Sequence, residues 1–144
     1  DAKYPMPHSH VAGNELDMSF SGLKTAVINI YNTDNMKGVQ TDIDSLAASF
    51  QDKIAQILSD NLTNAAKEYG FDKIAIAGGV SANTRLRELI EQKADGRKFY
   101  APRMSLCGDN GAMIAAQGYY EFINGKTAGL DLNGIPSLPI DFDC

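Results

Sequence analysis

The chain has 144 residues, which is enough for one domain with a buried core. Hydrophobic residues make up 44% and charged residues 22%, as is ordinary for a globular protein in water. The net charge of −5 argues against a nucleic-acid-binding surface on this chain alone, because neutralising phosphates requires clustered Lys and Arg. The two cysteines, Cys107 and Cys144, are too few for a disulfide framework or a zinc site, and we expect a reducing, intracellular setting.

The first ten residues, DAKYPMPHSH, do not resemble a signal peptide, and no apolar run approaches the length of a membrane span. Because the chain begins without Met in an irregular stretch, we expect it to be a piece of something longer. His8 and His10 have no third ligand close to them in sequence, so we interpret them as surface histidines in preference to a metal site.

Residues 18–20 predict the end of a short strand, and Ser21 is the expected N-cap of a helix that runs to Tyr31. Lys24 lies early in this helix and fits either a solvated charge or a contact to phosphate, the solvated charge being more common. The polar residues 32–40 predict a connection rich in turns.

The clearest predicted element is a helix of about 40 Å over residues 42–69. Thr41 and Asp44 resemble a capping box at its start, and Gly70 supplies its end. One continuous apolar stripe is expected to face the core; it consists of Ile43, Leu46, Ala47, Phe50, Ile54, Ile57, Leu58, Leu62, Ala65, Ala66 and Tyr69.

A strand, a glycine-containing turn and a helix are predicted next, over residues 73–77, 78–82 and about 83–93. Such a turn gathers free backbone N–H groups and a positive helix end, which suits a phosphate or another anion. Gly78 and Gly79 would let a ligand approach the backbone, while Ser81 or Asn83 could cap the helix or reach the ligand. The alternative is that any strand-to-helix turn needs small residues. A turn at residues 95–96 and a strand at 98–101 complete the alternation of an α/β domain.

The last predicted helix follows Gly108 and is apolar nearly all round, which predicts burial on most sides. Asp109 lies at its N-terminus and is either an N-cap, which its spacing favours, or a carboxylate that binds a metal or lies in a phosphate site. We interpret Cys107 as a small buried side chain in preference to a nucleophile. Residues 124–144 are rich in Asn, Gly and Pro and predict an extended tail.

Three segments in this order resemble one protein family. They are SFSGLKT at residues 19–25, GGVSAN at 78–83 followed by Leu86 and Arg87, and CGDNGAMIA at 107–115. Together they are similar to the C-terminal half of the TsaD family of tRNA threonylcarbamoyladenosine transferases. This is the glycoprotease family, once described as O-sialoglycoprotein endopeptidases. The resemblance covers residues 19–123.

The resemblance implies an α/β fold, with residues 1–144 forming a single domain. This domain would be the C-terminal lobe of an actin-like ATPase (RNase-H-like) fold, helix-rich with a few short strands. The family moves a threonylcarbamoyl group from threonylcarbamoyl-adenylate to N6 of the adenosine next to the anticodon of tRNA. The family is cytoplasmic, and its partners would be ATP, tRNA and bacterial subunits similar to TsaB and TsaE.

The resemblance also implies roles for individual residues. Asn83 would contact the substrate beside Gly78 and Gly79, and Asp109 would be a ligand to Fe²⁺ or Zn²⁺. The other metal ligands would be two histidines of an H-x-x-x-H motif, which this chain does not contain. We identify no general base, and the catalytic residues stay unassigned.

We therefore expect the chain alone to be inactive and to bind metal weakly, because one carboxylate cannot supply three or more ligands. Apolar surface left uncovered could make it a dimer. Two alternatives remain: a non-catalytic scaffold of the same fold, and a metalloprotease. The protease would need a motif such as H-E-x-x-H, which is absent from the sequence.

Overall fold

The structure is a computed structural model that describes residues 3–8, 11, 13 and 16–139. The chain forms two compact units, Asp1–Cys107 and Gly108–Cys144. Whether the 144 residues make one domain stays a prediction.

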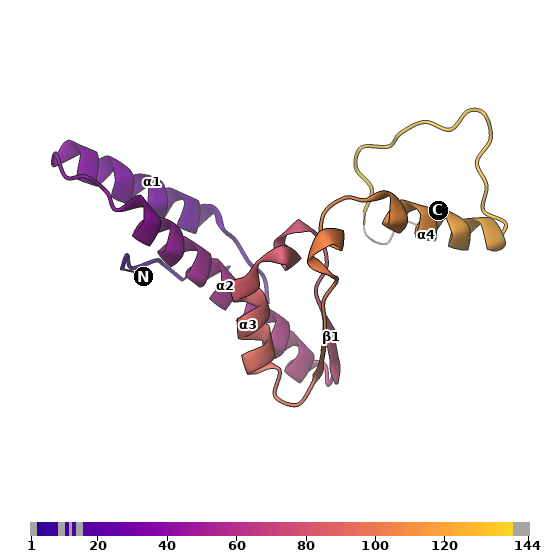
Figure 1. The fold of residues 1–144 in the computed structure, drawn as a ribbon, viewed down its shortest axis with the longest axis horizontal. Coiled ribbons are helices and arrows are strands. Elements are labelled where there is room, and N and C mark those ends of the chain that lie inside the picture. The colour runs from indigo at the N-terminus through magenta and orange to yellow at the C-terminus, as the bar shows by residue number, and fades with distance from the viewer. Residues whose placement is uncertain (1–2, 9–10, 12, 14–15, 140–144) are drawn as a thin grey trace. The chain divides into compact units, whose positions relative to one another are not determined.

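The first helix, α1, spans Ser21–Met36 and lies alongside the beginning of the next helix (Figure 1). Our prediction of its start was wrong: Phe20 occupies the N-cap position without a side-chain hydrogen bond, and Ser21 is already helical. The helix also continues past Tyr31, because nothing in the polar residues that follow breaks it before Gly38, which has φ +67°. Residues 18–20 form no strand.

The long helix, α2, spans Ile43–Glu68, and its predicted length is confirmed. Its cap differs from our prediction. Asp42 is the N-cap, and its Oδ1 accepts a hydrogen bond of 3.1 Å from the N–H of Ser45. Thr41 takes no part in a capping box with Asp44, since its hydroxyl donates to Asp34 Oδ2 at 3.0 Å. The helix ends as predicted at Gly70, which has φ +71°.

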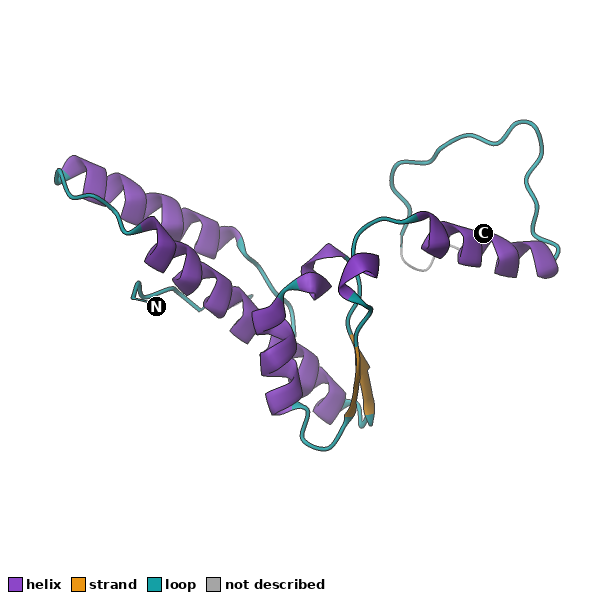
Figure 2. Ribbon diagram, viewed as in Figure 1, coloured by secondary structure: helices purple, strands orange, loops and turns teal. Residues whose placement is uncertain are grey.

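A strand–helix–strand unit follows α2. It consists of β1 (Lys73–Ala75), a 3₁₀ turn η1 (Gly79–Ala82), α3 (Thr84–Lys93) and β2 (Lys98–Tyr100). The two strands, orange in Figure 2, pair in parallel with Ile74 opposite Phe99. The first strand is shorter than the predicted 73–77, although the N–H of Ile76 still donates to the carbonyl of Tyr100 at 3.1 Å.

The core of the first unit lies between α2, α3 and β1. The apolar stripe of α2 faces it over the middle of the helix, but the two ends of the stripe do not: Ile43 and Tyr69 are 55% and 65% exposed. Ion pairs of 2.7 Å join Asp52 to Arg85 and Asp60 to Lys93, and so fasten α2 to α3 at the rim. The buried side chains of this core are Ala55, Ala66, Ile74, Leu86, Leu89, Ile90 and Ala94.

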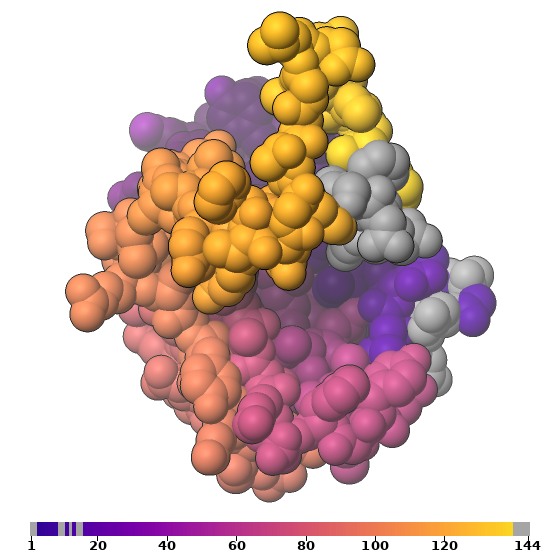
Figure 3. Space-filling view, turned by 90° about the vertical axis from the view of Figure 1, so that its right-hand side faces the viewer, coloured from indigo at the N-terminus to yellow at the C-terminus, as the bar shows by residue number. Residues whose placement is uncertain are grey.

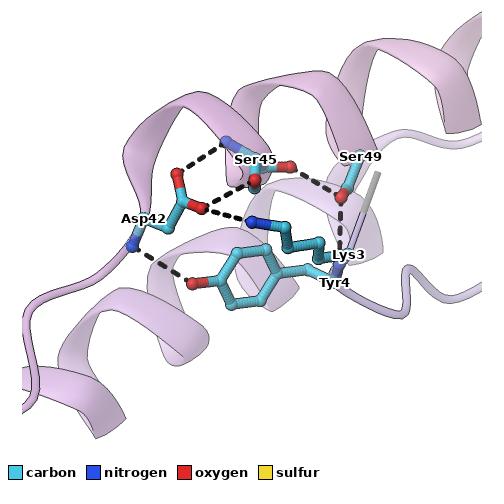
Figure 4. A network of polar contacts seen from close by, with 5 residues as sticks. All are labelled: Lys3, Tyr4, Asp42, Ser45 and Ser49. Carbon is cyan, nitrogen blue, oxygen red and sulfur yellow. Dashed lines mark hydrogen bonds and ion pairs between the residues drawn. The ribbon is translucent and has the colours of Figure 1, made fainter. Parts of the chain in front are cut away.

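The start of α2 also binds the N-terminal segment (Figure 4). Lys3 Nζ donates to Asp42 Oδ2 at 3.0 Å, and the backbone N–H of Tyr4 donates to Ser49 Oγ at 3.0 Å. The hydroxyl of Tyr4 accepts from the N–H of Asp42 at 3.2 Å. Hydrogen bonds from Ser45, with the nearby charge of Lys3, lower the pKa of Asp42 to about 2.

The second unit contains α4, Gly111–Ile123, followed by irregular chain. Our prediction that α4 is buried on most sides was wrong, because none of its residues is buried. Burial needs a neighbouring element, and no other helix or strand lies in the described part of this unit. Figure 3 shows the described atoms of this unit in orange to yellow. Residues 124–139 are exposed and form turns, without helix or strand.

None of the helices in the described ranges is both long and apolar enough to cross a membrane.

Candidate functional site

The turn after β1 depends on Gly78. This residue has φ +83° and ψ 176°, a conformation that is essentially restricted to glycine. An added Cβ would meet no atom within 4 Å, so a side chain would have room here. Glycine is required by the backbone angle and not by a lack of space. Gly79 then begins η1, and both glycines are exposed. The backbone at this turn is therefore exposed to solvent, and ligand binding there stays a prediction.

Ser81 faces the interior of the turn. Its side chain is 2% exposed, and its hydroxyl donates a hydrogen bond of 2.6 Å to the carbonyl of Gly78. Its own N–H donates to the same carbonyl at 3.0 Å. Ser81 therefore closes the turn from within. We expected either Ser81 or Asn83 to cap the helix or to reach a ligand, and Ser81 is not the cap.

Asn83 is the N-cap of α3. Its Oδ1 accepts a hydrogen bond of 3.0 Å from the N–H of Leu86, so one of the two predicted alternatives is confirmed. The carbonyl half of the amide is thus occupied, while the Nδ2 group has no hydrogen-bond partner in the described chain. An amide fixed at one end in this way can present its two N–H donors to a ligand at the start of α3.

A cavity of about 400 Å³ adjoins the turn. It lies between α2 and α3 and reaches the end of β1, where ligands bind in α/β sheets. Sequence reasoning missed this cavity, because the leucines on both helices were assigned to the core. Its lining is mainly apolar and includes Leu58, Leu62, Ile76, Val80, Leu86 and Ile90.

Asp109 belongs to the second unit, so the structure does not relate it to the turn of the first unit. It is exposed and is not the N-cap of α4. Asn110 has that role, accepting a hydrogen bond of 3.0 Å from the N–H of Met113. The capping interpretation of Asp109 was therefore wrong. No hydrogen bond or ion pair joins Asp109 to another described residue, which leaves both carboxylate oxygens available to a ligand.

The remaining candidates contribute less. Cys107 is 4% exposed, which confirms it as a small buried side chain. His8 is exposed, and His10 lies outside the described residues. Lys24 is exposed as well, and its role stays open. Over the ranges that the structure describes, no cluster of three or more His, Cys, Asp or Glu side chains could hold a metal.

Comparison with known proteins identifies the family of this chain. The family model described as TsaD, tRNA N6-adenosine threonylcarbamoyltransferase, matches residues 1–116. A curated protein of that name from Clostridium botulinum (strain Kyoto / Type A2) is 41% identical over 140 residues, covering 96% of this chain and 41% of the relative. One from Clostridioides difficile (strain 630) is 40% identical over 137 residues, which is 94% of this chain and 40% of the relative. One from Fusobacterium nucleatum is 46% identical over 134 residues, 88% of this chain and 39% of the relative.

The chain thus spans about two fifths of the length of these relatives. All three carry the name of a transferase, which favours neither the protease nor the scaffold alternative. The predicted helix-rich α/β class is confirmed, and the family implies the actin-like arrangement for it. The chain belongs to the TsaD family of tRNA N6-adenosine threonylcarbamoyltransferases.

Proposed function

We propose that this chain is the C-terminal lobe of a tRNA N6-adenosine threonylcarbamoyltransferase and supplies one wall of its nucleotide site. The whole enzyme would move the threonylcarbamoyl group from threonylcarbamoyl-adenylate to the adenosine next to the anticodon. Family membership supports this reaction, and the relatives that share 40–46% of the aligned residues carry its name.

The observation that carries the proposal is the cavity of about 400 Å³ beside the Gly78 turn. Its apolar lining suits the flat face of a nucleobase, and its volume is within the range of small-molecule sites. The exposed backbone at Gly78 and Gly79 and the start of α3 suit the phosphate of the adenylate. Asn83, with its amide nitrogen available, would donate a hydrogen bond to the same ligand.

Asp109 would bind a divalent metal, Fe²⁺ or Zn²⁺. Its exposed carboxylate without a described partner fits one ligand position, and the two histidines of an H-x-x-x-H motif, which this sequence lacks, would fill others. A bound metal would supply Lewis acidity and orientation at the carbonyl that the adenosine amine attacks. We assign no residue of this chain as general base. Without the rest of the protein, the chain would bind the metal weakly and would not transfer the threonylcarbamoyl group.

The partners and location follow from the same proposal. The lobe would act on tRNA in the cytoplasm, together with subunits similar to TsaB and TsaE. In the absence of the other lobe, exposed apolar side chains such as Ile114, Tyr119 and Phe122, each at least 60% exposed, would favour a dimer of the chain. Sedimentation velocity over a range of concentrations tests the dimer, and a monomer at every concentration would exclude it.

Calorimetric titration of ATP, or of a stable threonylcarbamoyl-adenylate analogue, tests the proposed site. The titration uses this chain and a longer protein in which it is joined to the rest of the relatives' sequence, with Fe²⁺ or Zn²⁺ present. We expect binding by the longer protein, loss of binding on Asn83→Ala, and weak binding by the chain alone. Equal binding by the chain alone would show that the nucleotide site is complete here. No binding by the longer protein would favour the scaffold.

A further inference from the structure

One guanidinium group joins three separate segments of the first unit. Arg87, on the first turn of α3, donates from Nε to the carbonyl of Ser81 at 2.6 Å. Its Nη2 donates to the carbonyl of Pro102 at 2.7 Å and lies 3.3 Å from the Sγ of Cys107. The side chain thus contacts η1, the segment after β2 and the last residue of the unit.

The acceptors explain why arginine stands here. Two of them are backbone carbonyls, that of Ser81 in the short 3₁₀ turn η1 and that of Pro102 in the irregular segment after β2, and no α-helix or sheet hydrogen bond of the described residues holds either. Hydrogen bonds from a charged donor are stronger than neutral ones, and the planar fork of arginine reaches several acceptors in fixed directions. A lysine offers a single nitrogen and could not span the same three atoms.

On one side, the contact leads to the candidate ligand-binding turn. Ser81, which accepts from Arg87, is itself bonded through its hydroxyl and its N–H to the carbonyl of Gly78. Arg87, Ser81 and Gly78 therefore form a continuous chain of hydrogen bonds. The guanidinium is thus linked by hydrogen bonds, through Ser81, to the turn that exposes the Gly78 and Gly79 backbone.

On the other side, the contact leads to Cys107. The thiol is 4% exposed and also donates to the carbonyl of Arg103 at 3.4 Å, so both Arg103 and Arg87 hold it. Asp109 follows two residues later. The end of the first unit, from which the chain continues to the candidate metal ligand, is thereby fixed to the same side chain as the turn.

We propose that Arg87 is a positioning residue that couples the turn at residues 78–83 to the segment ending at Cys107. Its hydrogen bonds go to protein atoms, and we assign it no contact with the nucleotide or the metal. It fixes the conformation of the turn and the point from which the chain continues to Asp109. This inference deepens the proposed function and rests on it for its consequence in binding, but the coupling itself is a property of the chain alone.

Arg85 provides a matched control. It lies on the same first turn of α3, but it pairs with Asp52 at 2.7 Å and Glu88 at 3.6 Å. Among the described residues, both of its ion-pair partners lie on helices, α2 and α3. Arg85→Gln and Arg87→Gln remove the same charge two residues apart, and only the second removes the contacts to the turn and to Cys107.

The first experiment measures the alkylation rate of Cys107 in the 144-residue chain carrying Cys144→Ser, which leaves one thiol. Losing the hydrogen bonds of a charged group makes local opening easier, so Arg87→Gln should raise the alkylation rate about tenfold or more. Arg85→Gln should leave the rate within about twofold of the parent chain, because the thiol keeps its contacts. Circular dichroism checks that each variant keeps its helices.

The second experiment records amide chemical shifts of the same chain. Arg87→Gln should shift the amides of Gly78, Gly79 and Ser81 together with that of Cys107, although these residues are far apart in sequence. Arg87→Lys keeps the charge and most of the volume, and serves if the glutamine variant does not fold. It should shift both groups of amides in the same direction by a smaller amount. Arg85→Gln should shift neither group.

The third experiment separates this inference from the proposed function. In the longer protein, Arg87→Lys should weaken ATP binding about tenfold while Arg85→Gln leaves it unchanged. Failure of the unsubstituted protein to bind ATP would contradict the proposed function. The alkylation rates of Cys107 and the amide chemical shifts would still test whether Arg87 couples the two segments. If Arg87→Gln and Arg87→Lys both leave Cys107 protected and the turn amides unmoved, Arg87 does not couple the two segments and the inference is wrong.

Discussion

The side-chain oxygen of Asn83 accepts the hydrogen bond of Leu86 N–H at 3.0 Å, so the residue expected to contact the substrate also begins α3. The two roles use different atoms of one amide. The oxygen serves the helix, and the nitrogen is available to a ligand. Substitutions at this position can therefore separate stability from binding.

Asn83→Ala should lower the free energy of unfolding by about 1 kcal/mol, the usual contribution of an N-cap. Asn83→Ser keeps a capping oxygen and should stay within about 0.5 kcal/mol of the parent chain. Both variants lose the amide donors and should bind ATP more weakly in the longer protein. Urea unfolding and calorimetry measure the two effects. Full ATP affinity in Asn83→Ser would show that the amide nitrogen does not contact the nucleotide.

Gly78→Ala should destabilise the chain by about 1–3 kcal/mol, because alanine is strained at φ +83° and ψ 176°. The cost is conformational, since an added Cβ has no neighbour within 4 Å. Gly79→Ala is the matched control: it also has open space and lacks a positive φ, so its stability should change little. Thermal unfolding of both variants checks this. Equal losses would mean that the backbone angle of Gly78 is not what requires glycine.

Asp109→Asn should leave the stability of the chain unchanged, since no described residue depends on its carboxylate. In the longer protein it should reduce the bound Fe²⁺ or Zn²⁺, measured by elemental analysis after dialysis. Asn110→Ala is the contrasting variant. It removes the cap of α4 and should lower helix content, seen by circular dichroism, without removing a proposed ligand. Undiminished metal content in Asp109→Asn would exclude Asp109 as a ligand.

The stability of the chain should depend on pH in the acid range, because the pKa of Asp42 is lowered in the folded state. Its pKa is lowered from 3.8 to about 2 by the Ser45 hydrogen bonds and by Lys3. A lowered pKa in the folded state stabilises the fold above pH 3.8, and this contribution is lost as the pH falls toward 2. Asp42→Asn should therefore unfold at a lower temperature than the parent chain near neutral pH, and the difference should shrink between pH 4 and 2.

Ser45→Ala removes the hydroxyl that contributes most to this shift, and it should give an intermediate dependence on pH. Thermal unfolding of the parent chain, Asp42→Asn and Ser45→Ala between pH 7 and 2 measures this dependence. A difference between Asp42→Asn and the parent chain that stays constant down to pH 2 would contradict the proposed titration.

Local sequence signals determined much of the first unit. The 3.6-residue apolar period located α2, and Gly70 ended it at the expected place, because only a residue that adopts positive φ readily closes a helix there. The two strands on either side of α3 were predicted from the alternation of short apolar runs and a helix, while their parallel pairing came from the structure. The caps were less predictable. Neighbouring polar residues compete for one position, so Asp42 replaced the predicted Thr41 and Asn110 replaced Asp109.

The sequence by itself therefore determined the α/β class, the glycine turn, Asn83 as a candidate cap of α3, and the resemblance to the family. Only the tertiary structure decided which apolar residues are buried. The helix α4 has the apolar composition that is typical of a buried helix, but none of its residues is buried, because burial depends on what packs against a helix. Only the tertiary structure also revealed the cavity between α2 and α3 and the three acceptors around Arg87. Both features bring together residues that are distant in sequence.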